Sequence, residues 1–188
     1  PTTRDLTPYA GKTIRFAFFH SAYSGSGCSG TSFGWYVDDV QIEKSVPAFA
    51  GDFEQGWSQW SADNGVWQVG TPTAGPSACQ GGAQCAGTVL DGNYPGDTDS
   101  RLISPSIQLP AVNTGEEIQL RFWQWFSYAT ANVADCDAGY VQVSVQDAGT
   151  GIWSAWATVG PATVYSSGWS PTTRDLTPYA GKTIRFAF

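Results

Sequence analysis

The chain has 188 residues and a formal net charge of −7, because sixteen Asp and Glu residues outnumber nine Lys and Arg residues. A nucleic-acid partner requires a basic surface, and a membrane span requires a long apolar run, so neither class of protein is expected from this sequence. Abundant Gly, Ser, Thr and aromatic residues with few Lys and Arg are typical of secreted β-rich bacterial proteins rather than of cytosolic enzymes.

The predicted elements are strands throughout. The first, Thr13–Phe19, places Ile14, Phe16 and Phe18 on one face, with the period of two expected of a half-buried strand. In chain order, the later strands are expected at Phe33–Glu43, Gly65–Gly70, Arg101–Leu109, Ile118–Phe126, Tyr140–Val145 and Ile152–Val159. Turn-rich clusters of Gly, Pro, Asn and Asp separate them, and no segment has the pattern of an amphipathic helix. The sequence therefore predicts an all-β, antiparallel β-sandwich.

An exact repeat gives the chain its organisation. The first eighteen residues, PTTRDLTPYAGKTIRFAF, return unchanged at 171–188, which is 170 residues later. The sequence begins with Pro and contains no Met, so we expect it to be part of a longer polypeptide. The preferred interpretation is one 170-residue period of a tandem-repeat array, followed by the start of the next period. An engineered duplication is the alternative.

The domain boundary is expected inside the sequence. The segment KSVPAFAG, which contains Pro, Ala and Gly, follows one predicted strand and precedes a new series of strand patterns. We therefore assign residues 1–45 to the C-terminal part of one repeat and residues 46–51 to a linker. Residues 52–188 then form the N-terminal and central part of the next repeat.

Several motifs resemble one family of domains. GWYVDDVQI at 34–42 resembles a last strand, DFEQGW at 52–57 a first strand, and RLISPSIQL at 101–109 a strand between them. RFWQWFSY, GYVQVSV and DLTPYAGKTIRFAFF follow in the same order. Together they are similar to the jelly-roll modules of secreted bacterial proteins, of the cleaved-adhesin and MAM-like kind. The resemblance implies a jelly-roll topology for the sandwich and structural calcium near its first and last strands, but no particular activity.

Four cysteines indicate disulfides. No CxxC motif occurs and His20 is the only histidine, so a usual zinc site cannot be completed. Disulfides in an oxidising compartment are the better interpretation. Cys79 and Cys85 bracket a short, flexible loop, and Cys28 and Cys136 lie in turn-like segments. Three pairings are allowed, of which 79–85 with 28–136 is favoured.

Two pairs of carboxylates are the candidate metal ligands. Asp38 and Asp39 are adjacent within a predicted hydrophobic strand, and Asp52 and Glu54 lie in the opening strand. Clustered carboxylate oxygens suit Ca²⁺, which takes six to eight oxygen ligands. The pairs are expected to meet either across the linker or between one module and the copy of Asp39 one period later. In the alternative interpretation, one carboxylate of each pair is solvated and the other caps backbone N–H groups.

Two further D-x-D loops, with Asp97 and Asp99 in one and Asp135 and Asp137 in the other, are expected to be solvated turns. No GxSxG motif accompanies His20, so we do not expect an enzyme.

Nine tryptophans raise the question of glycan binding. Most of these rings are expected in the core, because each large ring buries about 150–250 Å². A sugar platform would require two or three exposed, coplanar rings, and Trp57 and Trp60 are the candidates for ligand-binding aromatics.

The leading hypothesis is an extracellular or cell-surface structural protein. Its tandem sandwiches would form a filament, fibre or stalk, with neighbouring copies of itself as partners, because identical modules present the same interface repeatedly. The alternative is an adhesin module that binds a glycan or a surface protein, or an accessory domain of a secreted protease.

Overall fold

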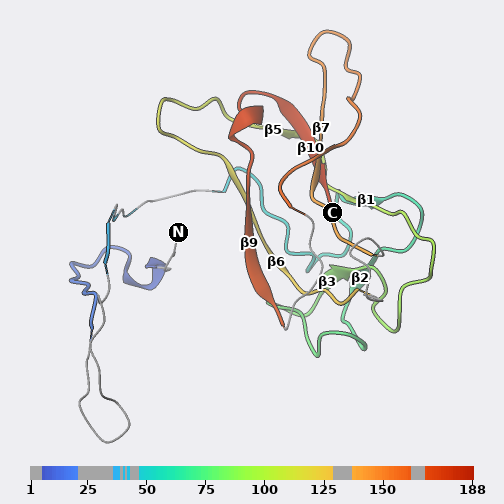
Figure 1. Ribbon diagram of the computed structural model, residues 1–188, viewed down its shortest axis with the longest axis horizontal. Helices are drawn as coiled ribbons and strands as arrows, with labels where there is room; N and C mark the ends of the chain where they lie inside the picture. The colour runs from blue at the N-terminus through green and yellow to red at the C-terminus, as the bar shows by residue number, and fades with distance from the viewer. Residues whose placement is uncertain are drawn as a thin grey trace, which may run out of the picture. The chain divides into compact units, whose positions relative to one another are not determined.

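The computed structural model of the chain describes residues 6–20, 36–38, 40, 42, 47–128, 137–161 and 168–188 (Figure 1). The chain divides into two compact units, Pro1–Ser45 and Val46–Phe188. The division lies at the start of the range predicted as a linker, 46–51. Phe49, within that range, packs against the core of the second unit.

The second unit confirms the all-β prediction. Its described residues contain no α-helix, and every strand pair is antiparallel. The strands are β1 (Ser61–Ala62), β2 (Gln68–Gly70), β3 (Cys85–Gly87), β4 (Leu102–Ile103), β5 (Ile107–Gln108), β6 (Gln119–Gln124), β7 (Gln142–Val145), β8 (Ala157–Thr158), β9 (Ser170–Asp175) and β10 (Thr183–Ala187). One short 3₁₀ helix, η2 (Thr177–Tyr179), lies between β9 and β10.

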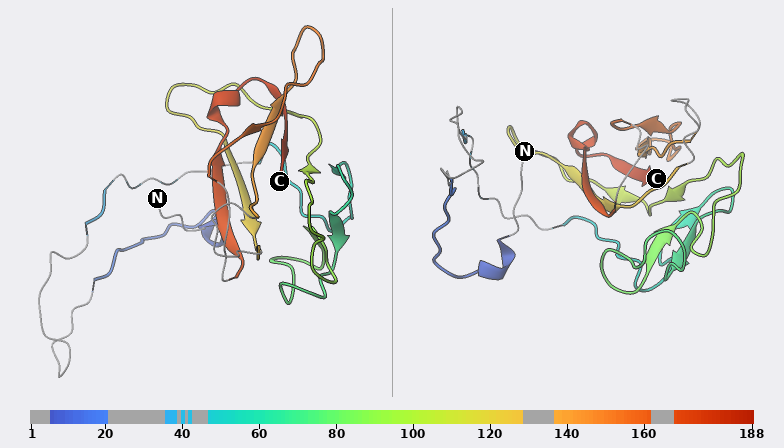
Figure 2. Two further views of the ribbon diagram at one scale, coloured as in Figure 1. Left: turned by 45° about the vertical axis from the view of Figure 1, so that its right-hand side comes forward. Right: turned by 60° about the horizontal axis from the view of Figure 1, so that its bottom comes forward.

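Strand β10 is the centre of the largest sheet. This sheet has six strands in the order β1-β4-β10-β7-β8, and β5 also pairs with β10. β6 pairs with β9 in a separate two-stranded sheet, and β2 pairs with β3 in another. In Figures 1 and 2, β6 and β9 lie side by side, and η2 carries the chain from β9 across to β10.

The hydrophobic core lies between the six-stranded sheet and the β6–β9 pair. Alternation along β10 turns Ile184 and Phe186 inward, where they are 0% and 3% exposed. Leu176 and Val143 are buried with them, and Leu120 of β6 packs against this cluster from the other sheet. The two sheets thus bury a common core, in the manner of a sandwich.

Most of the strand ranges predicted for this unit contain a strand in the structure. β2, β6, β7 and β8 lie within predicted ranges, whereas the range 101–109 is split into β4 and β5. Pro105 has no N–H group and interrupts the ladder there. The buried Ser104 bridges the gap, since its N–H donates to the Phe186 carbonyl at 2.9 Å and its hydroxyl accepts from the Phe186 N–H at 3.0 Å.

The first unit differs from its prediction. Among its described residues the only regular element is η1 (Thr7–Tyr9), a 3₁₀ helix. The predicted strand Thr13–Phe19 is wrong for this copy, because none of the described residues 13–20 is assigned to a strand. Of the predicted strand Phe33–Glu43 the structure describes residues 36–38, 40 and 42, and none of these belongs to a strand.

Candidate functional site

The repeated segment occurs twice in the structure. We name Leu6–Phe18 the first ribbon and Leu176–Phe188 the second ribbon, because their sequences are identical. Both contain the same turn. The N–H of Tyr9 donates to the Leu6 carbonyl at 2.9 Å, and the N–H of Tyr179 donates to the Leu176 carbonyl at the same distance. The conformation of this turn therefore follows from its own residues.

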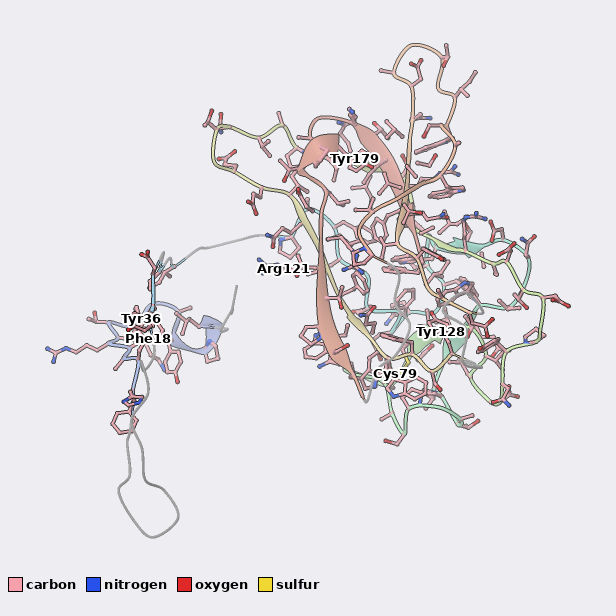
Figure 3. All side chains as sticks on the ribbon, in the orientation of Figure 1. Phe18, Tyr36, Cys79, Arg121, Tyr128 and Tyr179 are labelled. Atoms are coloured by element: carbon pink, nitrogen blue, oxygen red, sulfur yellow. A yellow bond between two sulfur atoms is a disulfide. The ribbon has the colours of Figure 1, made fainter. Side chains whose placement is uncertain are left out.

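The two ribbons differ in how far their apolar side chains are exposed to solvent. Ile14 is 37% exposed, whereas its counterpart Ile184 is fully buried. Phe16 is 52% exposed, whereas Phe186 is 3% exposed. Figure 3 labels Phe18 in the first unit and Tyr179 in the second. The first ribbon thus presents to solvent the apolar residues that the second ribbon places in a core.

The exposed apolar surface of the first unit continues beyond the ribbon. Phe19 is 82% exposed, and Tyr36, Val40 and Ile42 are 79%, 51% and 67% exposed. Large exposed apolar side chains of this kind are normally covered by another part of the protein or by a partner. In the repeat register predicted above, residues 1–45 are the C-terminal part of a module, so these side chains are expected to pack against the remainder of that module.

The place that the second ribbon occupies is closely fitted. On one side, Leu102 and Phe188 exchange two backbone hydrogen bonds, of 3.0 and 3.1 Å. On the other side, the N–H of Gln146 donates to the Thr183 carbonyl at 2.9 Å. We name this place between β4, β5 and β7 the ribbon slot. Its walls are backbone ladders on both edges and aromatic rings on the core face.

An acidic residue of the opening segment is bound by a disulfide loop. Cys79 and Cys85 form the predicted disulfide, and the loop that it closes directs the N–H groups of Ala83 and Gln84 toward Glu54. Both donors lie 3.0 Å from Glu54 Oε1, and Ala83 N–H also lies 3.1 Å from Oε2. The carboxylate therefore ties the opening segment to the loop. The other predicted pair, Cys28 with Cys136, lies outside the described residues.

Replacing Glu54 with Ala, in the presence of EDTA, is expected to lower the free energy of unfolding by about 1–2 kcal/mol. The substitution removes an ionised acceptor from backbone N–H groups, and partial exposure of the site reduces the value of such bonds. Asp52→Ala is the matched control. Asp52 is exposed and accepts a local bond from the Glu54 N–H at 3.2 Å, so a change within about 0.5 kcal/mol is expected. Equal losses in urea unfolding would contradict the assignment.

The four predicted calcium ligands are distributed over both units. Asp38 is an exposed residue of the first unit, Asp39 lies outside the described residues, and Asp52 and Glu54 belong to the second unit. The contacts of Glu54 are those of a backbone cap, the alternative interpretation. No group of three or more His, Cys, Asp and Glu side chains is arranged to hold a metal within the part of the chain that the structure describes. The calcium site stays a prediction.

The two candidate ligand-binding aromatics lie near the core. Trp60 packs among four rings, with centroid distances of 5.8 Å to Phe49, 5.0 Å to Phe53, 5.5 Å to Phe186 and 6.5 Å to Phe188. Trp57 is half-buried in the same segment. The environment of Trp60 corresponds to the core position that is expected for most of these rings.

A cationic stack on the other face of the central sheet was not predicted. The guanidinium carbon of Arg185 lies 4.1 Å from the centroid of the Trp153 ring and 5.2 Å from that of Trp156. Arg101 lies 5.8 Å from the Trp156 ring and forms a salt bridge with Asp63 at 3.1 Å. Burial lowers the pKa of Arg185. The only sequence signal was the alternation of β10, which turns Arg185 away from the core.

The stability of the second unit is expected to fall as the pH drops below about 3.8, the ordinary pKa of Asp147 and Asp175. Hydrogen bonds from the Thr150 hydroxyl and N–H lower the pKa of Asp147, and those from the Thr177 hydroxyl and N–H lower the pKa of Asp175. A lowered folded-state pKa contributes stability above the unfolded value, and this contribution is lost as pH falls through the folded value. Thermal midpoints measured from pH 6 to pH 2 test this. Asp147→Asn with Asp175→Asn should flatten the profile, and an unchanged profile would contradict the assignment.

The loop with Asp97 and Asp99 borders a hollow of about 360 Å³. Its lining residues are Asn64, Val66, Pro95, Asp97, Thr98 and Asp99. The Asn64 side-chain amide donates to the Asp99 carbonyl across this loop. A polar turn with internal hydrogen bonds agrees with the solvated loop that is expected from the sequence.

Among the residues that the structure describes, no helix has the length and apolar character needed to span a lipid bilayer. Comparison with known proteins found no matching family model, no matching curated protein and no matching solved structure. The resemblance to jelly-roll modules of secreted bacterial proteins therefore stays a prediction.

Proposed function

We propose that this chain is an extracellular structural protein whose sandwich modules repeat every 170 residues and join into a filament, fibre or stalk. The modules are proposed to have jelly-roll topology. The observation that carries the proposal is the exact return of residues 1–18 at 171–188, which is 170 residues later. Identical modules in one chain present the same surfaces repeatedly, which suits a filament or stalk.

Two further features support this proposal. The Cys79–Cys85 disulfide is compatible with an extracellular protein, because such bonds persist in oxidising compartments. The unit Val46–Phe188 has its own core between two sheets, which suits a module that resists force in an array.

The test is assembly of the purified full chain. Electron microscopy and light scattering over a range of concentrations are expected to show extended oligomers that lengthen with concentration. A chain that stays monomeric at millimolar concentration would overturn the structural role. Selective binding in a glycan-array screen, together with the monomeric state, would favour the adhesin alternative instead.

The proposal includes structural calcium held by Asp38, Asp39, Asp52 and Glu54, from the same or neighbouring modules. Calcium that binds only the folded state raises its stability by mass action. The thermal midpoint of the full chain is therefore expected to be higher in calcium chloride than in EDTA. The double variant Asp38→Asn with Asp39→Asn should remove that difference, and equal midpoints for the natural sequence would argue against the ion.

A further inference from the structure

We infer that Arg185, with Trp153 and Trp156 beside it, forms a binding site for the carboxylate of an acidic glycan. The site lies on the outer face of the six-stranded sheet, within the unit Val46–Phe188. It goes beyond the proposed filament function, because it concerns what a single module binds rather than how modules join. Glycan binding and filament assembly can therefore fail independently.

Alternation along β10 places Arg185 on the face of the sheet opposite the core. Ile184 and Phe186 point inward, so Arg185 between them points outward. Its register partner Ser144 lies on the same face of β7. The Ser144 hydroxyl donates to the Ser154 carbonyl at 2.8 Å, which fixes the connection between β7 and β8 against the sheet. This connection carries both tryptophans, so two neighbouring strands and one anchored connection build the site.

The two tryptophans orient the Arg185 guanidinium without accepting its hydrogen bonds. Its central carbon lies 4.1 Å from the centroid of the Trp153 ring and 5.2 Å from that of Trp156. An aromatic face attracts a cation and aligns the guanidinium plane. The N–H groups at the edge of a guanidinium match the two oxygens of a carboxylate. Stacking therefore prepares Arg185 to bind a planar anion.

The N–H groups of Arg185 have no acceptor within the described ranges of the chain. Its Nε is shielded from solvent and has no hydrogen-bond partner there, and no described carboxylate forms a salt bridge with it. Arg174 differs, because its Nη1 and Nη2 donate to the carbonyls of Thr173 and Pro161 at 3.1 and 3.2 Å. A partly buried cation without an acceptor is unfavourable, and a bound carboxylate would offset that cost.

A second guanidinium lies next to the first. The guanidinium carbon of Arg101 is 5.8 Å from the centroid of the Trp156 ring. Arg101 is already paired, since it contacts Asp63 at 3.1 Å and donates from Nε to Gln142 at 2.8 Å. The charge of Arg185 therefore remains as a local positive excess in a chain with a net charge of −7. Such an excess attracts an anion that the rest of the surface repels.

The same charge distribution selects the class of ligand. A net charge of −7 disfavours densely charged polymers such as nucleic acids. A glycan with a uronate at every second sugar presents isolated carboxylates separated by neutral rings. Trp153 and Trp156 are half-buried, and Ile152, the residue before Trp153, is 68% exposed, so apolar surface is available to such rings. The occupant is thus a uronate-containing glycan.

The first experiment titrates the full chain with a hyaluronan hexasaccharide, in which every second sugar is a uronate. Calorimetry is expected to show saturable binding that weakens as sodium chloride is raised. In nuclear magnetic resonance spectra, the Nε–H signal of Arg185 is expected to shift. The methyl ester of the same hexasaccharide keeps every ring and loses its charges. It is expected to bind at least about tenfold more weakly, the factor for one lost charge-assisted hydrogen bond.

The second experiment compares matched arginine variants. Arg185→Gln is expected to lower the affinity at least about tenfold. Arg185→Lys keeps the charge but lacks the planar fork, so it should not restore the affinity. Arg121→Gln is the control, because Arg121 is exposed on β6 and donates from Nε and Nη2 to Gln119 at 3.2 and 2.9 Å. Its affinity should be that of the natural sequence. Thermal midpoints show whether each variant folds, and the methyl ester needs no variant.

Each contrary result overturns a stated part of the inference. Equal affinity for the hexasaccharide and its methyl ester would exclude a role for the carboxylate. Equal losses in the Arg121 and Arg185 variants would mean that general charge, not this site, holds the glycan. Poly-glutamate that binds as tightly as the hexasaccharide would indicate an acidic protein partner instead of a glycan. An unmoved Arg185 signal at saturating hexasaccharide would place any binding elsewhere. Electron microscopy of Arg185→Gln reports filament assembly separately.

Discussion

Replacing Ile184 with Ala is expected to lower the free energy of unfolding of the Val46–Phe188 unit by about 2–5 kcal/mol. Ile184 is fully buried in β10, where it pairs with Val145 of β7 and Ile107 of β5. Truncating the side chain removes apolar contacts on both sides and leaves a cavity that the two ladders hold open. Urea unfolding followed by far-UV circular dichroism measures the loss.

Ile14→Ala is the matched control for this change. It alters the same residue within the same local sequence, but Ile14 is 37% exposed and belongs to no strand. The stability of the second unit at low protein concentration is expected to change by less than about 0.5 kcal/mol. A loss as large as that of Ile184→Ala would mean that the first ribbon also has a buried site under these conditions.

Replacing Trp60 with Ala is expected to cost about 3–5 kcal/mol of unfolding free energy in the same unit. The Trp60 ring joins the segment before β1 to the central strand, since it contacts Phe49 and Phe53 on one side and Phe186 and Phe188 on the other. Gly51 also packs directly on this ring, where an added Cβ would lie 3.0 Å from the indole nitrogen. Loss of the ring should therefore loosen the opening segment as well as the core.

Trp123→Ala provides the comparison for Trp60, because Trp123 is 48% exposed on β6. Its replacement should cost much less, since half of the ring is already in water. Hydrogen exchange offers a second measurement. In the Trp60 variant, amides of residues 47–60 should lose protection before those of β7. Equal costs for the two tryptophans would show that Trp60 is not part of the core.

Much of the sheet could be predicted from side-chain alternation. β6 and β7 lie inside Ile118–Phe126 and Tyr140–Val145, because apolar residues at every second position have only one arrangement that buries them. The six-residue separation of Cys79 and Cys85 similarly favoured their pairing across a short loop, one of three pairings that the sequence allowed. These features depend on residues close together in the sequence.

Other features of the same unit depend on partners far away in the sequence. β9 begins with Ser170 and Pro171, which favour a turn, and it is a strand because β6 offers six registered partners. Glu54 is held by N–H groups about thirty residues later. Arg185 stacks on Trp153 and Trp156, which lie in the connection between β7 and β8. No local pattern specifies any of these contacts.

The repeated segment shows, within one chain, what the local sequence determines and what depends on tertiary contacts. The turn of Leu6–Lys12 recurs in Leu176–Lys182 with the same hydrogen bonds, so the sequence by itself determined it. The strand Thr183–Ala187 has no counterpart at residues 13–17, although the letters are identical. A turn closes its hydrogen bonds within a few residues, whereas a strand needs neighbours to receive its N–H and C=O groups. Only the tertiary structure, by supplying β4, β5 and β7, decided which copy became a strand.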